Sequence, residues 1–197
     1  MRVLVVSGHP DLNRSRVNAE FLEQLSESSA TIHRLSENHR HYEFDIAREQ
    51  DLLRRHDRIV FLFPLYWYSV PALMKKWLDD VFLPGFAYAR GGDKLADKEF
   101  LVVTAVGAPA EGYRAGGFNN YTIDELLRPI QQTAFYVKAR YLPPISVYES
   151  VFIEDAAIKT EVKSLLPRII GAQERPDEVY EKLLLKAEAA QIELISA

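Results

Sequence analysis

RIVFLFPLYWYSVPALMKKW, residues 58–77, is the stretch that decides the fold of this chain. After Arg58 it begins with an apolar run typical of a strand that is covered on both faces. A proline and three consecutive aromatic residues follow, and Pro71 stands where the first turn of a helix would open. In a sheet of parallel strands, the turn after such a strand lies at the edge where ligands bind. Flat rings at that edge favour a flat, conjugated ligand, and we interpret them as the wall of a flavin site.

Four further segments have the length and composition of strands: Arg2–Ser7, Thr31–Leu35, Glu99–Thr104 and Ala139–Val147. Helices are predicted between the strands, over Arg16–Glu27, Gln50–His56 after an Asp45 cap, Val70–Phe82, and Thr122–Lys138, where Thr122 and Glu125 are spaced as a capping box. Strands that alternate with helices predict parallel βαβ units. The expected fold is therefore α/β: a flavodoxin-like, three-layer, doubly wound sandwich around a five-stranded parallel sheet of order 2-1-3-4-5.

The end of the chain, about residues 155–197, reads as a helical tail of a single domain that spans residues 1–197. One helix is predicted near Asp155–Leu165. A second is predicted from Pro176 to about Leu194. The apolar stripe of this second helix would consist of Val179, Leu183, Leu184 and Ala187.

The composition excludes several classes of function. A net charge of -4 offers no positive surplus for nucleic acid. The absence of cysteine excludes disulfides, thiolate metal sites and cysteine nucleophiles. His39 and His41 have i, i+2 spacing without a third ligand nearby, so we expect no metal site. No signal peptide and no apolar span of about 20 residues is evident, so we expect a soluble, cytoplasmic protein, with a peripheral position at the inner face of the membrane as the alternative.

The loop after the first strand has the composition of a phosphate site. His9 ends the strand, and Ser15, Arg16, Val17 and Asn18 lead into the next helix. Free N–H groups and the positive end of the helix dipole favour an anion there. This loop holds a single glycine, so it lacks the G-x-G-x-x-G pattern of a pyrophosphate site, and one phosphate is expected. The alternative is that Ser15 only caps the helix and that His9 is a turn residue.

The loop after the third strand is expected to face the ring of the flavin. It follows Pro64, and the backbone N–H groups of Leu65, Tyr66, Trp67 and Tyr68 are expected to bond the ring carbonyls and nitrogens. Trp67 would pack on a ring face. The alternative is a packing cluster or a contact between two copies of the chain, since more aromatic residues lie on the next helix.

The loop after the fourth strand comprises Thr104, Ala105, Val106 and Gly107. Its glycine would let the backbone approach the ring closely. Farther along, Tyr113 is a candidate to donate a proton or a hydrogen bond to a reduced substrate oxygen. The glycines around Tyr113 suggest a mobile cover of the site. The alternative is that Tyr113 is an ordinary surface tyrosine.

These motifs together resemble the NAD(P)H:quinone oxidoreductase family of flavodoxin-like flavoproteins, and above all its small bacterial branch. That branch includes the ancillary protein of the glutathione-regulated potassium-efflux system and the general stress protein 14 group. The resemblance covers about residues 1–150. Five segments carry it in order: Gly8-His9-Pro10 with Ser15–Asn18, Pro64–Trp77, Pro84–Tyr88 with Gly91-Gly92 and Lys98, Tyr113–Gly117, and Tyr141–Pro144.

The resemblance implies a bound FMN, with FAD as the alternative, and a homodimer whose partner chain completes each site. It implies a ping-pong cycle in which NAD(P)H, a transient co-substrate, passes a hydride to flavin N5 and leaves before a quinone or another small electrophilic acceptor enters. Two positions depart from the family pattern. The family often has Thr-Thr-Gly-Gly where this chain has residues 104–107, and its human-type members carry a histidine where this chain has residues 117–119. Flavin affinity is expected to differ, and Tyr113 would act alone or with water.

Two other functions stay open at this point. The chain would also suit a regulatory flavin-binding subunit of a potassium efflux transporter, because one fold and one site can serve both roles. A one-electron carrier of the flavodoxin kind is the other alternative. The lid around Tyr113 and the modest net charge argue against that carrier.

Overall fold

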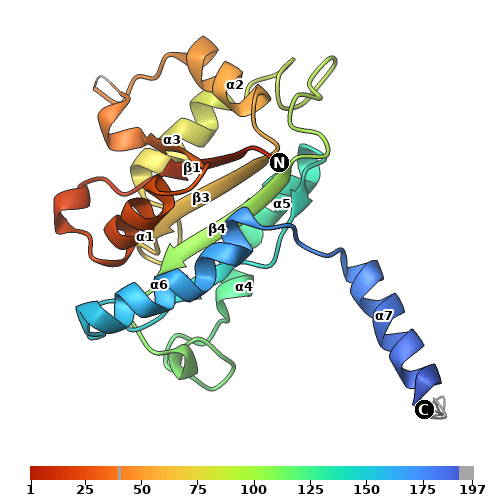
Figure 1. Ribbon diagram of the computed structural model, residues 1–197. Coiled ribbons are helices and arrows are strands. Elements are labelled where there is room, and N and C mark those ends of the chain that lie inside the picture. The colour runs from red at the N-terminus through yellow and green to blue at the C-terminus, as the bar shows by residue number, and fades with distance from the viewer. Residues whose placement is uncertain (40, 191–197) are drawn as a thin grey trace.

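The computed structural model describes residues 1–39 and 41–190, and its strands and helices alternate along most of the chain (Figure 1). The strands are β1 Val3–Ser7, β2 Thr31–Arg34, β3 Arg58–Pro64, β4 Glu99–Ala105, β5 Arg140–Tyr141 and β6 Ile145–Val147. The α-helices are α1 Val17–Ser26, α2 Ile46–Arg54, α3 Ala72–Val81, α4 Ile123–Leu126, α5 Arg128–Tyr136, α6 Asp155–Ile170 and α7 Pro176–Ala189. Short 3-10 turns cover Leu12–Arg14, Leu35–Glu37 and Ala110–Gly112.

The sheet is parallel and has the order β2-β1-β3-β4-β5, which confirms the predicted topology, while β6 also pairs with β4. The register places Ser7 of β1 opposite Leu62 of β3, and Phe63 of β3 opposite Thr104 of β4. The three central strands therefore end at the same edge. The loops that follow them start side by side.

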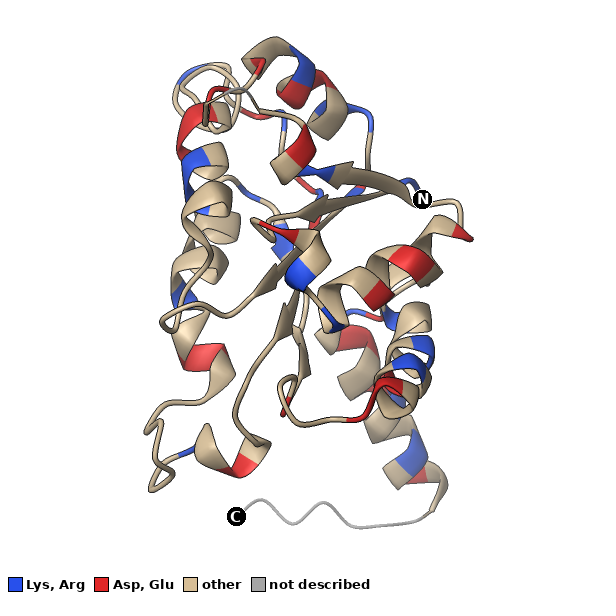
Figure 2. Ribbon diagram, turned by 90° about the vertical axis from the view of Figure 1, so that its left-hand side faces the viewer, with Lys and Arg blue, Asp and Glu red and all other residues tan. Residues whose placement is uncertain are grey.

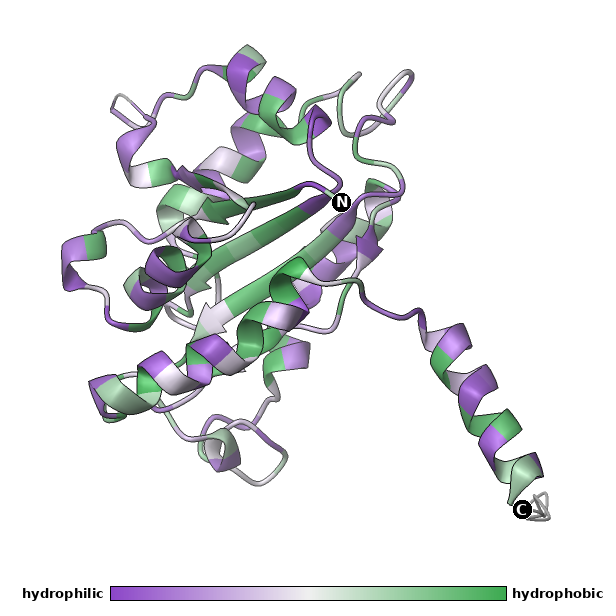
Figure 3. Cartoon of the chain, in the orientation of Figure 1, coloured by the Kyte–Doolittle hydropathy of each residue, from purple (hydrophilic) through white to green (hydrophobic). Residues whose placement is uncertain are grey.

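Each face of the sheet has its own apolar core. Alternate strand residues such as Val6, Phe61 and Val102 pack with α2, α3 and α5. Their neighbours, such as Val5 and Leu62, pack with α1 and α6. The apolar colouring of the central strands in Figure 3 corresponds to these two cores. Both faces of each strand are covered, which explains why the strands read as continuous apolar runs.

Three predicted elements have different bounds in the structure. The strand predicted over Ala139–Val147 is two short strands, because Pro143 and Pro144 have no N–H to donate to a sheet. The helix predicted over Thr122–Lys138 is divided into α4 and α5 just before Pro129, although the capping box of Thr122 and Glu125 is present. The polar helix predicted over Gln50–His56 starts earlier, directly after the confirmed Asp45 cap.

Both helices predicted for the tail are present, but the bounds of the first one differ from the prediction. α6 continues to Ile170 with Pro167 inside it, beyond the predicted end near Leu165. The last helix, α7, starts at Pro176 as predicted, and its predicted end at Leu194 lies outside the described residues. α7 extends away from the rest of the molecule (Figure 1), and none of its residues is buried.

Charges of both signs are distributed over the helices (Figure 2). Many form pairs one turn apart, as Lys75 does with Asp79 and Lys76 with Asp80 on α3. Within the described residues, no helix combines the length and the apolar character that crossing a membrane requires.

Candidate functional site

The candidate site lies at the edge of the sheet where β1, β3 and β4 end. Backbone bonds lock the three loops together there. The N–H of Gly8 donates to the carbonyl of Leu62 at 2.9 Å, and the N–H of Leu65 donates to the carbonyl of Ala105 at 2.9 Å. The ends of the strands therefore form one continuous rim, as the sequence predicted. Thr104, Ala105, Val106 and Pro64 are buried in this rim, and Gly107 is exposed.

His9 lies buried at the start of the first loop. The backbone N–H of Asp11 donates to Nδ1 of His9 at 3.1 Å, so in the neutral ring the proton is on Nε2, which is then a donor. Burial lowers the pKa of His9 below its usual value, against the opposing charge of Asp11. The imidazole also lies edge-on to the ring of Tyr66, with 6.3 Å between centroids. His9 thus joins the first loop to the second.

The start of α1 has no side-chain cap. Arg16 occupies the capping position without such a bond, and no bond from Ser15 to the first turn is found among the described residues. Val17 and Asn18 are buried in this first turn. The alternative that Ser15 only caps the helix is therefore not what the structure shows. The first N–H groups of a helix have no partner within the helix. In α1 no side chain of the described residues binds them either, so they are available for an anion.

The guanidinium of Arg16 is already bound within the chain. It donates to the carboxylate of Asp155 at 2.6 Å and to the carbonyls of Val151 and Ile153 at 3.3 and 2.5 Å. These bonds fasten the loop before α6 to the start of α1. The side chain of Arg16 is therefore engaged within the chain, and its backbone N–H is the group that it can offer to an anion.

The aromatic loop after β3 is a tight turn. Tyr66 and Ser69 exchange two backbone hydrogen bonds of 3.0 Å, and Trp67 and Tyr68 between them have φ angles of 46° and 63°. Residues other than glycine adopt this left-handed conformation at a cost of about 1–2 kcal/mol. Such strain occurs most often at functional sites. The indole of Trp67 is 92% exposed, so this ring is not part of the core.

The turn also corrects one expectation about the backbone. The N–H groups of Leu65 and Tyr66 are bound to the carbonyls of Ala105 and Ser69, so they are not available to a ligand. For Trp67 and Tyr68, the described residues include no acceptor bound to the N–H. Of the four N–H groups that the sequence suggested, these two remain.

A cleft of about 230 Å³ lies beside the turn. Its lining comes from the second and third loops and consists of Leu65, Trp67, Tyr68, Ala108, Tyr113, Phe118 and Asn119. The hydroxyl of Tyr68 donates to Oδ1 of Asn119 at 3.1 Å across the cleft. The structure brings Trp67, Tyr68 and Tyr113, three residues of the predicted site, to one cleft. The sequence analysis did not predict that Phe118 and Asn119 line this cleft. It mentioned their segment only because human-type members of the family carry a histidine there.

Tyr113 is partly buried at the border of this cleft. Burial, followed by the neighbouring Tyr68 and Tyr148, raises the pKa of its hydroxyl. The phenol therefore keeps its proton through the neutral range and can donate it. Tyr148 lies 6.1 Å away between ring centroids, and the sequence gave no signal for this neighbour.

Three buried oxygens at this rim have no hydrogen-bond partner among the described residues: Oγ of Ser7, Oδ1 of Asn18 and Oγ1 of Thr104. They lie at the end of β1, in the first turn of α1 and near the end of β4. All three side chains are at most 1% exposed, so a ligand at the surface of the rim does not reach these oxygens as the loops stand. By the alternation along the strands, Ser7 faces α1 and α6, as Asn18 does from its helix, whereas Thr104 faces α3 and α5.

A parallel sheet of this order, an uncapped helix after β1 and an aromatic rim are features of the flavodoxin class of folds. The sequence model of the family described as "Flavodoxin-like fold" matches residues 1–168. The chain therefore belongs to the flavodoxin-like family.

Curated relatives narrow the comparison. The chain is 38% identical over 193 residues to an uncharacterized NAD(P)H oxidoreductase, YdeQ, of Bacillus subtilis, covering 98% of each chain. It is 40% identical over 148 residues to the glutathione-regulated potassium-efflux system ancillary protein KefG of Cronobacter sakazakii, covering 75% of this chain and 80% of KefG.

Solved structures agree with this placement. General stress protein 14 of Treponema denticola, solved in complex with FMN, superposes with a TM-score of 0.81 at 31% identity, over 88% of this chain and 100% of that one. An NADPH-quinone reductase of P. pentosaceus superposes with a TM-score of 0.79 at 32% identity, over 88% of this chain and 100% of that one.

Proposed function

We propose that this chain is an FMN-dependent oxidoreductase that takes electrons from NAD(P)H and reduces a quinone or a similar small electrophile. The uncapped start of α1, at the same edge of the sheet as the exposed aromatic turn, is the observation that carries the proposal. The FMN complex of a relative with the same fold supports the choice of FMN over FAD. The names of the relatives support NAD(P)H and a quinone as the reaction partners.

The first loop would hold the phosphate of the cofactor. The uncapped N–H groups at Arg16, Val17 and Asn18 would bind its oxygens, with Ser15 and the Nε2 proton of His9 as further donors. The rigid backbone of the rim would hold the ring, with Trp67 and Tyr68 at its edge and the buried Thr104 near its polar side.

When bound, FMN would accept a hydride from NAD(P)H and pass it to the acceptor in a second, separate half-reaction. The protein contributes binding, orientation and exclusion of water. Leu65 and Phe118 give the cleft apolar walls, and Tyr113 brings a protonated hydroxyl to its border. We propose that this hydroxyl donates a hydrogen bond or a proton to the oxygen of the acceptor as that oxygen gains negative charge.

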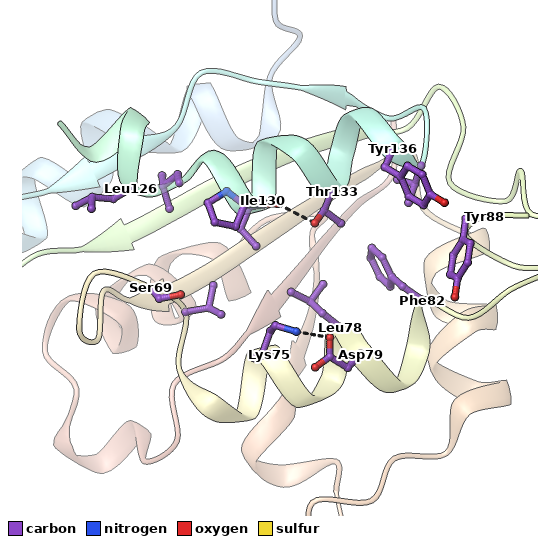
Figure 4. Close-up of a pocket in the computed structure, with 14 residues that line it drawn as sticks. Ser69, Lys75, Leu78, Asp79, Phe82, Tyr88, Leu126, Ile130, Thr133 and Tyr136 are labelled. Carbon is purple, nitrogen blue, oxygen red and sulfur yellow. Dashed lines mark hydrogen bonds and ion pairs between the residues drawn. The ribbon is translucent and has the colours of Figure 1, made fainter. Parts of the chain in front are cut away.

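We also propose that the protein acts as a homodimer. A groove of about 340 Å³ runs between α3 and α5, with Ser69 at one end and Tyr88 and Tyr136 at the other (Figure 4). Leu78, Phe82 and Ile130 make most of it apolar. An exposed apolar groove next to an exposed aromatic turn is typical of a surface that contacts another protein. A second copy in this groove would also lie close to the candidate site, which agrees with a site completed by two chains.

The similarity to KefG favours a second candidate function, in which flavin occupancy regulates a potassium efflux transporter. The site would be the same, and only the use made of it would differ. Either function is compatible with a cytoplasmic protein, which we propose.

The affinity of the protein for FMN and for riboflavin tests the proposal, because riboflavin lacks the phosphate. We expect tight binding of FMN, weaker binding of riboflavin, and NAD(P)H oxidation when a benzoquinone is added to the FMN form. The variant Asn18→Leu removes the side-chain amide of the first turn of α1, whose N–H groups can donate to a phosphate, and should lose about tenfold in FMN affinity, corresponding to about 1.4 kcal/mol, with little change for riboflavin. Ser15→Ala, at a less buried position, should shift FMN in the same direction. Protein that binds neither ligand would refute the proposal.

A further inference from the structure

α7 carries an apolar stripe that no other part of the described chain covers. Val179, Tyr180 and Leu183 are 50%, 61% and 60% exposed. With Leu184 and Ala187 they recur at intervals of three and four residues, which places them on one face of the helix. The sequence predicted this stripe. The structure adds that α7 extends away from the rest of the molecule (Figure 3) and that none of its residues is buried.

The fold is complete without α7. The match to the flavodoxin-like family ends at residue 168, before α7 begins at Pro176. The structure of general stress protein 14 of Treponema denticola corresponds to 88% of this chain over its entire length. The stripe on α7 therefore has no part in closing the two cores, and its apolar character needs another explanation.

Hydrogen bonds hold the connection between α6 and α7 at its start. The fully buried Arg58 donates from Nη1 to the carbonyls of Ile169 and Gly171 at 2.6 and 2.8 Å. Nε2 of Gln173 donates to the carbonyl of Arg168 at 2.8 Å. These contacts fix the end of α6 and the first residues of the connection. They indicate that α7 leaves the body in a defined direction.

The base of α7 lies next to the groove between α3 and α5. The lining of the groove ends at Tyr136 and Val137. The residues that follow, Lys138–Arg140, share a second cavity of about 590 Å³ with Arg175 and Glu178 at the start of α7. Val137 and Lys138 are consecutive, so the start of α7 lies near the end of the groove that Tyr136 lines.

The charges of α7 argue against a membrane as the other occupant. Its polar face holds the acids Asp177, Glu178, Glu181 and Glu188, against the bases Lys182 and Lys186. Helices that lie on anionic lipid surfaces have a basic polar face. A protein surface is the better match for a stripe with mixed, predominantly acidic flanks.

From these observations we propose that α7 is a clasp, which packs its apolar stripe against a second copy of this chain seated in the groove. The inference rests on the homodimer proposed above and adds a contact to it. In a two-fold dimer each chain gives one α7 and receives one, so the contact forms twice.

A matched pair of substitutions in the full chain tests the clasp. Leu183→Asn places an amide in the stripe. Leu185→Asn makes the same change two residues away, on the opposite side of the helix, where the leucine is 56% exposed. Sedimentation velocity over a concentration series gives the dimer dissociation constant. We expect Leu183→Asn to weaken the dimer about tenfold or more, corresponding to about 1.4 kcal/mol, and Leu185→Asn to match the wild type.

A second pair separates the clasp from the dimer itself. Tyr136→Ser changes the groove, and Phe135→Ser changes the other side of α5, where the ring is 78% exposed. If Tyr136→Ser dissociates the dimer and Leu183→Asn does not, the dimer stands and the clasp is wrong. A wild type that is monomeric at every concentration overturns both. Binding of the wild type to phosphatidylserine vesicles that Leu183→Asn abolishes, without effect on the dimer, would also overturn the clasp. NAD(P)H oxidation is assayed separately in every variant, so the failure of one proposal does not decide the other.

Discussion

The indole N–H of Trp77 donates to Oε2 of Glu49 at 2.7 Å, and the same oxygen lies 2.7 Å from Nε2 of His33. All three side chains are buried, and they join β2, α2 and α3. A buried carboxylate is tolerated only when it is paired and hydrogen-bonded.

Removal of this carboxylate should weaken the fold strongly. We expect Glu49→Leu to lower the free energy of unfolding by about 3–5 kcal/mol, because Trp77 and His33 then lose their shared partner in the interior. Glu49→Gln keeps an acceptor oxygen and should lose about 1–2 kcal/mol. Urea denaturation followed by circular dichroism gives both values. Equal losses in the two variants would show that the charge, and not the hydrogen bond to Trp77, matters.

The strain in the aromatic turn predicts opposite effects on stability and on ligand affinity. Trp67→Gly relieves the left-handed backbone and removes a side chain that is almost fully exposed, so the free energy of unfolding should rise by about 0.5–1 kcal/mol. FMN affinity should fall, because a neighbour of the ring is lost. Thermal unfolding and fluorescence titration measure the two quantities.

Lys138 provides the control for this prediction. It also has a positive φ angle, 62°, and it lies outside the residues that line the cleft. Lys138→Gly should raise stability by a similar amount and leave FMN affinity unchanged. A fall in affinity in both variants would mean that backbone strain, and not the indole, determines binding.

The lowered pKa of His9 predicts how stability depends on pH. The folded protein protonates His9 at a lower pH than the unfolded chain does, because burial disfavours the charged ring. As pH falls below about 6.5, the unfolded chain takes up a proton that the folded one does not, and the fold loses stability. His9→Asn removes this proton uptake. The stability of the wild type relative to His9→Asn should therefore be highest near pH 8 and should decrease toward about pH 5.5. Urea denaturation of the ligand-free proteins at the two pH values checks this, and a relative stability that increases on acidification would contradict it.

Tyr113 should affect turnover and not cofactor binding. Tyr113→Phe removes one hydroxyl, and we expect the turnover with a benzoquinone to fall about tenfold or more. FMN affinity should stay within about twofold. Since the pKa of Tyr113 is raised, the wild-type turnover should not decline between pH 7 and about pH 9 through loss of this proton. Stopped-flow measurement of flavin reduction and reoxidation separates the steps. A change confined to the reductive step would refute the proposed role.

The topology of this chain could be predicted because each central strand is covered on both faces and so reads as a continuous apolar run. The bounds of the elements could not. Pro143-Pro144 and Pro129 act through missing N–H groups, and their effect depends on which neighbours the backbone has in the sheet or helix. At the site, residue types indicated where a ligand would lie. Hydrogen bonds between segments distant in sequence then determine which groups are available to a ligand. The guanidinium of Arg16 is bound to the carboxylate of Asp155, and the backbone N–H of Leu65 is bound to the carbonyl of Ala105.

Arg58 has a consequence for how the molecule opens. With Glu99 and the end of α6 it ties together the edge of the sheet where the strands begin, while the loops at the opposite edge form the candidate site. Amide hydrogens near Arg58 should therefore exchange with heavy water only through global unfolding, and those near Ser7 and Thr104 through small, frequent openings. A bound cofactor would slow amide exchange only at the edge of the sheet that holds the site. The difference in exchange rate between the two edges would therefore report whether the cofactor is bound.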